Sequence, residues 1–237
     1  MNLSQPMPAT ASPPTPISPG GADTGARRRG GMPAFFDDAP TLTVRDPLAA
    51  FLGAAEGGLI EYRYADAVRL AGHSCPTVAG AYLMTLHGLR ALYGDELPER
   101  GGVQVFLHEA PDSGTTGVVA AVAQLLTGAA RETGFQGIGP AGVFSRQHLL
   151  SFGADMDGAL GLRRRDSGRA VQVRLEAGAV PWPEEMRALL PRVMVGRTSA
   201  DDELRFGVLW QERVRRMLIE HADDPALIQV SDWDGAP

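Results

Sequence analysis

The segment GHSCPTVAGAYLMTLHGLRALYG, residues 72–94, carries the clearest structural signal in the chain. Pro76 suits the first position of a helix, because the N–H that it lacks would have no partner there. Gly94 is a typical residue for the end of a helix. Apolar side chains between these two residues recur at helical spacing and form one stripe: Val78, Tyr82, Leu86, Leu89 and Tyr93. The sequence therefore predicts an amphipathic helix over residues 76–93.

Helix and strand signals mix on both sides of this segment. Strands are predicted at 60–64, 103–108, 159–165 and 170–176, the last two joined by a hairpin turn. Further helices are predicted from Asp46-Pro47 onward and at 65–71, 115–127 and 201–220. The helix at 115–127 is apolar on nearly all sides, which is typical of a helix buried in a domain or a dimer interface. The predicted fold class is α+β, with a mixed or antiparallel sheet packed on this buried central helix in a single domain.

The chain divides into two parts by composition. Residues 1–40 are rich in proline, glycine, serine and threonine and contain few large apolar residues. Such a segment cannot offset the entropy cost of ordering by burying side chains, so it is predicted to be disordered. Residues 41–237 are predicted to form the folded domain.

Composition also limits the class of protein. The 237 residues are 44% hydrophobic, which is enough for one substantial core. No stretch approaches the roughly 20 apolar residues that cross a bilayer. The net charge of −6 disfavours nucleic acid or an anionic membrane as a partner. All 22 basic residues are arginine, so Schiff-base chemistry and a P-loop lysine are excluded.

The single cysteine, Cys75, narrows the chemistry further. It excludes an intramolecular disulfide, an all-cysteine metal site and an iron–sulfur cluster within one chain. A solitary thiol is compatible with a reducing compartment, and the N-terminus lacks the pattern of a signal peptide. The predicted location is the cytoplasm.

His73 and Cys75 stand two residues apart at the predicted helix start. The thiolate is the metal-binding form of cysteine, and a helix N-terminus favours negative charge. An imidazole and a thiolate together suit zinc, nickel, copper or iron(II). Two other interpretations stay open. In the first, the pair is structural: Cys75 is a small buried residue, and His73 forms hydrogen bonds at the helix entry. In the second, the pair is catalytic: Cys75 is a nucleophile and His73 is its base.

Residues 72–76, followed by Gly80, resemble the Gly-His-x-Cys-Pro-Gly signature of the formylmethanofuran dehydrogenase E-subunit family. Less specific matches follow in the same order at residues 124–128, 135–137 and 168–171, so the resemblance spans residues 60–178. In that family the histidine and cysteine of the signature are metal ligands, usually assigned to zinc. The resemblance implies that His73 and Cys75 bind zinc or another transition metal ion in residues 41–237.

The chain also departs from the family pattern. Cysteines that members often carry near the second motif are missing at 117–119 and 129–130, and no C-terminal zinc finger follows. Another group must therefore complete a metal site. His108, at the end of a predicted strand, is the predicted third ligand. Glu109 and Asp112 are candidates for orienting the ligands or acting as a general base. Three protein ligands with one open position are typical of catalytic zinc.

Three functions follow from these residues. The first is a transition-metal protein, with zinc as the leading metal, which uses the ion as a Lewis acid on an unknown small-molecule substrate. The second is a non-catalytic accessory or metal-handling subunit of a redox complex, in which the helix at 115–127 contributes to an oligomer interface. The third is a thiol enzyme that uses Cys75 and His73. The predicted partners are a metal ion and a second copy of the chain in a homodimer, with neither nucleic acid nor membrane involved.

Overall fold

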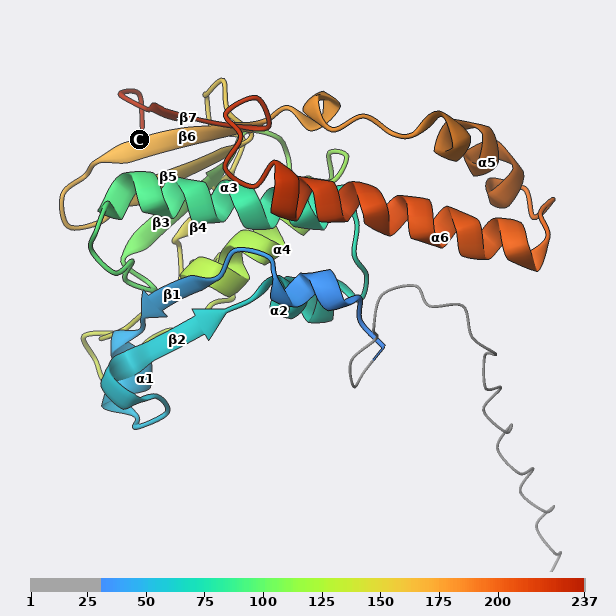
Figure 1. The fold of residues 1–237 in the computed structure, drawn as a ribbon. Helices are drawn as coiled ribbons and strands as arrows, with labels where there is room; N and C mark the ends of the chain where they lie inside the picture. Colours follow the sequence, from blue (N-terminus) through green and yellow to red (C-terminus); the bar gives the residue numbers. More distant parts are fainter. Residues whose placement is uncertain (1–30, 237) are drawn as a thin grey trace, which may run out of the picture.

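The computed structural model describes residues 31–236 and contains two sheets and six α-helices within that range. A five-stranded sheet forms one layer, and helix α3 (Pro76–Tyr93) covers one face of it (Figure 1). Helices α2 (Tyr64–Ala71) and α4 (Thr116–Thr127) pack on the other side of α3. A pair of helices, α5 (Glu184–Met194) and α6 (Ala200–Arg215), extends away from these layers. Between residues 31 and 236, no helix is both long enough and apolar enough to cross a membrane.

The main sheet is mixed. Its strand order is β4-β3-β5-β6-β7, with β3 and β4 parallel and the other neighbouring pairs antiparallel. The strands are β3 (Val103–Leu107), β4 (Leu150–Phe152), β5 (Leu160–Arg164), β6 (Ala170–Leu175) and β7 (Ile228–Asp232). The predicted strands at 103–108, 159–165 and 170–176 are confirmed, and so is the hairpin between the last two. Strands β4 and β7 were not predicted.

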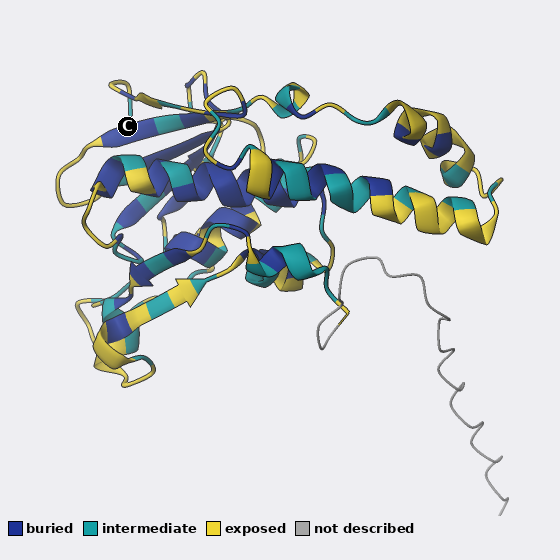
Figure 2. Cartoon of the chain, in the orientation of Figure 1, coloured by how far each residue is buried: buried dark blue, intermediate teal, exposed yellow. Residues whose placement is uncertain are grey.

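Helix α3 (Pro76–Tyr93) has the predicted bounds, with Pro76 at its first position and Gly94 at its C-terminal cap. Thirteen of its 18 residues are buried, so it is the central helix of the domain (Figure 2). Gly80 and Gly88 allow its close approach to the sheet. A Cβ at Gly88 would lie 2.6 Å from the Leu162 side chain, and one at Gly80 would lie 2.3 Å from Leu175. The helix therefore packs directly against β5 and β6.

The predicted fold class is confirmed, because an α+β domain packs a mixed sheet on a buried helix. The helix at 115–127 was predicted to be buried at the centre of the domain or in a dimer interface, whereas within the described residues the most buried helix is α3. Helix α4 (Thr116–Thr127) packs against α3, but Gly117, Ala121 and Gln124 lie on an exposed face. Small residues made α4 look apolar on every side, whereas α3, which was predicted as amphipathic, is covered on nearly all sides.

The folded part of the chain begins before Thr41. Residues Ala34–Asp37 form a 3₁₀ turn, η1, and the Phe36 ring is buried against Tyr64 at a centroid distance of 5.0 Å. The predicted boundary at residue 41 is therefore too late, because the sequence does not show that Phe36 finds a partner in α2 (Tyr64–Ala71). Residues 1–30, for which disorder was predicted, lie outside the described residues.

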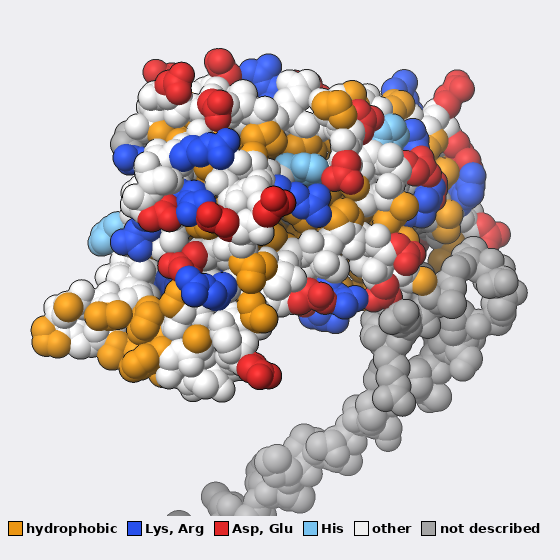
Figure 3. Space-filling model, turned by 60° about the vertical axis from the view of Figure 1, so that its left-hand side comes forward, with side chains coloured by type: hydrophobic (Ala, Val, Ile, Leu, Met, Phe, Trp, Pro, Cys, Tyr) orange, Lys and Arg blue, Asp and Glu red, His pale blue; other side chains and the backbone are white. Residues whose placement is uncertain are grey.

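Strands β1 (Leu42–Arg45) and β2 (Leu59–Tyr62) form a separate antiparallel pair, connected by helix α1 (Pro47–Phe51) and the short 3₁₀ turn η2 (Glu56–Gly58). The helix starts as predicted, since the Asp46 carboxylate accepts hydrogen bonds from the amides of Leu48 and Ala49. None of its residues is fully buried, however, and Phe51 is 64% exposed. Hydrophobic side chains gather on the lobe that α1 forms with residues 135–144 (Figure 3).

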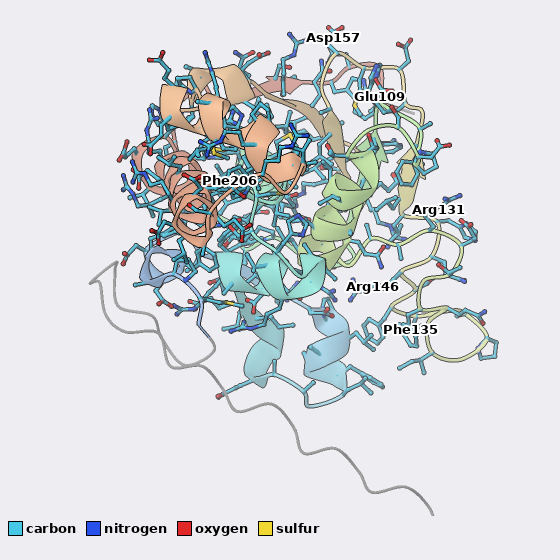
Figure 4. All side chains as sticks on the ribbon, turned by 90° about the vertical axis from the view of Figure 1, so that its right-hand side faces the viewer. Glu109, Arg131, Phe135, Arg146, Asp157 and Phe206 are labelled. Atoms are coloured by element: carbon cyan, nitrogen blue, oxygen red, sulfur yellow. The ribbon has the colours of Figure 1, made fainter. Side chains whose placement is uncertain are left out.

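A buried ionic cluster ties this lobe to the domain. Asp46 accepts hydrogen bonds from Arg100 at 2.9 Å and from Arg146 at 2.7 Å. The Arg146 side chain is 8% exposed, and its Nε atom has no hydrogen-bond partner. Arg146 reaches inward from the 129–149 loop, whereas Phe135 lies farther out on that loop (Figure 4). Only glycine fits at position 101, because a Cβ there would lie 1.3 Å from the Arg146 Nη1 atom. Gly101 also has a φ of +85°, which other residues rarely adopt.

Helices α5 (Glu184–Met194) and α6 (Ala200–Arg215) form an antiparallel pair that we call the arm, residues 184–212. The α6 helix was predicted, and it continues into the π-helical turn η4 (Arg216–Glu220). Helix α5 was not predicted. The arm has a small apolar cluster of its own, formed by Met186, Leu189 and Leu209 with Trp182, Phe206 and Trp210. Its tip is largely exposed (Figure 2).

Candidate functional site

The loop that contains His73 and Cys75 joins two helices with almost no slack. Gly72 ends α2 with φ +75°, and Cys75 is the N-terminal cap of α3. Only His73 and Ser74 stand between these caps. The short connection fixes the loop where α2, α3 and α6 meet.

Cys75 is 8% exposed and belongs to the main hydrophobic core. Its Sγ atom accepts a hydrogen bond from the Val78 amide at 3.5 Å, as expected of a residue that caps a helix. This amide belongs to the first turn of α3, where the peptide dipoles favour negative charge. The predicted position of the thiol at a helix start is therefore confirmed, and the structure adds that the thiol is buried.

His73 is exposed. Its Nδ1 atom lies 3.0 Å from the carbonyl oxygen of Ala71, the last residue of α2. When Nδ1 carries the proton and donates this bond, Nε2 keeps a lone pair that faces away from the backbone. Metal-bound histidines are usually held in this way, with one ring nitrogen donating to a carbonyl and the other on the ion.

Ser74, which lies between His73 and Cys75, was not predicted to be a site residue. It nevertheless forms more hydrogen bonds than either of its two neighbours. Its hydroxyl donates to Oε1 of Gln211 at 2.9 Å and accepts from the Tyr64 hydroxyl at 2.9 Å. Its carbonyl oxygen accepts from Nε2 of Gln211 and Nε1 of Trp210, both at 3.1 Å. Gln211 and Trp210 are more than 130 residues away in the sequence, so no local pattern could indicate these bonds.

The structure places His108 elsewhere. Its Nδ1 atom lies 3.2 Å from the Ala154 carbonyl oxygen, and its Nε2 lies 3.8 Å from the carboxylate of Glu109. Figure 4 shows Glu109 well separated from Phe206, which lies on α6. Across residues 31–236, no three histidine, cysteine, aspartate or glutamate side chains are grouped so that they could hold a metal ion. Within one chain, the predicted set of His73, Cys75 and His108 is thus not assembled.

The two acidic residues near His108 that were candidates for orienting the ligands or acting as a base do not approach His73 or Cys75 in any contact of the described residues. Glu109 accepts a hydrogen bond from the Ser113 hydroxyl at 3.1 Å, and Asp112 is exposed in the same loop. His87, on α3, is half-buried, with Nε2 2.7 Å from the Ala222 carbonyl oxygen. These contacts stabilise loops and bring no further ligand to the pair.

A thiol enzyme needs its base within hydrogen-bond reach of the nucleophile. In the described part of the chain, the Nδ1 of His73 pairs with Ala71 and the sulfur of Cys75 pairs with Val78. No hydrogen bond joins the two side chains in these residues. The contact between base and nucleophile that a thiol enzyme requires is therefore not formed by this pair.

The fold and the loop define an α+β domain with a His-x-Cys pair at a helix entry and a projecting helical arm. No protein-family model matches the chain, and no curated protein matches it. Among solved structures, it is similar to a tungsten formylmethanofuran dehydrogenase E-subunit-like protein from Syntrophus aciditrophicus, with 15% identity over 74% of each chain and a TM-score of 0.38. A similarity at this level supports no inference about the site.

Proposed function

We propose that this chain binds one transition metal ion through Nε2 of His73 and Sγ of Cys75. Zinc is the leading candidate for this ion. The observation that carries the proposal is the contact between His73 Nδ1 and the Ala71 carbonyl, which orients the ring and leaves Nε2 available. The amide of Val78 directed at the Cys75 sulfur adds support, since it holds the sulfur at the first turn of α3, two residues from His73.

Two donors do not complete a zinc site. Catalytic zinc has three protein ligands and an open position, and structural zinc has four. An ion bound here would supply Lewis-acid chemistry to bound water or a carbonyl group. The described residues provide too few ligands for that geometry, so we propose metal binding or metal handling rather than catalysis. The remaining ligands come from water or from a second copy of the chain.

Equilibrium dialysis with zinc and elemental analysis test the metal site. We expect the wild type to bind one zinc ion per chain, and the ion to protect Cys75 from iodoacetamide. Removing either ligand, in Cys75→Ser or His73→Ala, is expected to weaken binding at least about tenfold, or ~1.4 kcal/mol.

The His108→Ala variant serves as the matched control, because it removes an exposed histidine that the structure does not bring to the pair. Its zinc affinity is expected to equal that of the wild type, and a loss would instead support the predicted ligand role of His108. A wild-type protein that binds no zinc, with Cys75 labelled equally fast with and without the ion, would contradict the proposed function.

A second candidate function is self-association through the arm. Leu204 is 70% exposed and Val208 is 45% exposed, and both lie on the α6 face that carries Gln211, at positions i, i+4 and i+7. This apolar face begins at the Ser74 contact and runs outward along the arm. The inner end of this face, at Gln211, contacts the loop of His73 and Cys75, where the ligand set is incomplete. The proposed occupant is therefore the homodimer partner.

Light scattering coupled to gel filtration tests the dimer. We expect the mass of a dimer for the wild type and of a monomer for the double variant Leu204→Glu and Val208→Glu, because a buried carboxylate without a partner is costly. The matched control is Leu59→Glu on β2, which is 51% exposed and distant in sequence, and which should remain dimeric. A monomeric wild type at high concentration would exclude this candidate.

A further inference from the structure

We propose that the lobe formed by α1 and residues 135–144 enters the surface of a lipid layer that carries no net charge. The proposal depends neither on a metal ion nor on the arm. It depends on three properties of the lobe: exposed apolar side chains, a lack of charge, and backbone amides that are paired within the lobe. Figure 3 shows this lobe as a projection from the domain, with hydrophobic side chains over its surface.

Large apolar side chains are exposed on both segments of the lobe. Phe51 at the end of α1 is 64% exposed, and Leu52, the C-terminal cap, is 62% exposed. On the other segment, the exposed apolar side chains are Phe135, Ile138 and Val143. The rings of Phe51 and Phe144 join the two segments at a centroid distance of 5.4 Å. An exposed apolar surface of this kind usually marks a site of interaction with a protein or a membrane.

Neither segment of the lobe contains a charged residue. Residues 47–55 and 133–145 include no Asp, Glu, Lys, Arg or His. The two charged residues that precede the second segment, Arg131 and Glu132, pair with each other at 3.2 Å. A charged side chain pays for its lost hydration when it enters a lipid layer, and the lobe carries no side chain that would have this cost.

The backbone of the lobe indicates lipid rather than a protein as the partner. Ile138 and Val143 exchange two hydrogen bonds, at 2.8 and 3.1 Å, and Pro140 in the turn between them has no N–H. On the other segment, acceptors within residues 46–50 pair the amides of Leu48, Ala49, Ala50, Leu52, Gly53 and Ala54. Lipid offers no hydrogen-bond partner, so backbone that enters it must be paired internally. A protein interface typically forms about ten hydrogen bonds, for which these amides are not available.

The lobe is also held in place from below. Asp46 caps α1, and it accepts a hydrogen bond at 2.7 Å from Arg146, which directly follows the second segment. This buried pair fixes the two segments side by side. Because the apolar side chains are already presented by a fixed backbone, little conformational entropy is lost when the lobe is inserted.

The charge of the chain indicates which kind of lipid surface fits. A net charge of −6 opposes approach to an anionic leaflet, whereas a zwitterionic surface has no net charge to repel it. The prediction that no membrane takes part depended on this net charge and on the lack of a spanning segment. Neither argument applies to an uncharged lobe that enters one leaflet from outside, as interfacial segments do to a depth of about 5–10 Å.

Flotation of the full chain with phosphatidylcholine vesicles tests the proposal. We expect the wild type to float with the vesicles at low and at high salt alike, because the lobe carries no charge that salt could screen. The double variant Leu52→Glu and Val143→Glu places one carboxylate on each segment, and it should bind the vesicles at least about tenfold more weakly. The two side chains are 62% and 49% exposed, so the variant should keep its fold, which circular dichroism checks.

The matched control is the double variant Leu204→Glu and Val208→Glu, which makes the same two exchanges on the arm, at residues that are 70% and 45% exposed. It should float as the wild type does. A wild type that does not float, or that floats only with vesicles containing anionic lipid, overturns the proposal. Equal flotation of the lobe variant and the wild type also overturns it. A lobe variant of lower mass than the wild type in light scattering would assign the lobe to a second copy of the chain and overturn the proposal as well.

Discussion

Replacing Asp46 by asparagine is expected to lower the free energy of unfolding by about 3–5 kcal/mol, because it leaves two largely buried guanidinium groups without their counter-charge. Asp46 is 3% exposed, and among the described residues it is the only acidic group that forms an ion pair with Arg146 or Arg100. Asparagine caps helices about as well as aspartate, so the start of α1 should survive and the loss should reflect the charge. Urea denaturation followed by circular dichroism measures the effect.

The pH dependence provides an independent check. Burial opposes ionisation of Asp46, but the hydrogen bond from Arg100, the charge of Arg146 and the Ala49 amide outweigh it, so the pKa of this carboxyl lies below its ordinary value. A lowered pKa in the folded state stabilises the protein above the pKa of the unfolded chain. The stability difference between wild type and Asp46→Asn should therefore be constant above about pH 5 and shrink as the pH falls further.

Glu185→Gln is the control for Asp46→Asn, since it breaks an exposed ion pair with Arg205 in the arm. Exposed pairs contribute little to stability, so this variant should unfold at nearly the wild-type urea concentration. Equal stability of Asp46→Asn and the wild type would contradict this prediction. It would mean that water solvates Arg100 and Arg146 well enough that they do not need the Asp46 charge.

The sequence predicted the elements whose signals are local. Pro76 and Gly94 mark both ends of α3 within the segment itself, and the turn at residues 166–168 marks the hairpin of β5 and β6. Helix α5 was missed because prolines precede it and Pro191 lies inside it, which disguises the helical pattern. Strand β7 was missed because its own sequence shows no clear strand pattern. It is a strand because it pairs with β6, which lies far earlier in the chain.

The same distinction applies to the candidate site. The position of His73 and Cys75 at a helix entry was predictable, since Pro76 follows directly. The role of Ser74 was not, because its partners lie on α6. The predicted link to His108 treated the end of a strand as a neighbour of the loop, whereas His108 contacts Ala154. Proximity between residues from different elements depends on packing that single-residue patterns do not encode.

Replacing Arg213 by leucine is expected to lower the free energy of local unfolding of the arm by about 3 kcal/mol. The reason is that hydrogen bonds from a charged group contribute more to stability than hydrogen bonds between neutral groups. Arg213 donates from Nε to the Val180 carbonyl and from one terminal nitrogen to the Ala177 carbonyl, both at 2.7 Å. Its guanidinium also stacks on Trp182 at 4.0 Å from the ring centroid. The side chain thus fixes the segment that leads into α5.

The expected result is local rather than global, because the arm has its own apolar cluster and Arg213 lies at its base. Hydrogen exchange of residues 184–212 should become roughly 100-fold faster, which corresponds to about 3 kcal/mol. The main sheet should exchange as in the wild type. Arg205→Leu changes an exposed arginine on the same helix and should leave the arm unaffected. A uniform acceleration across β3, β5 and β6 would show instead that the arm and the domain unfold as one unit.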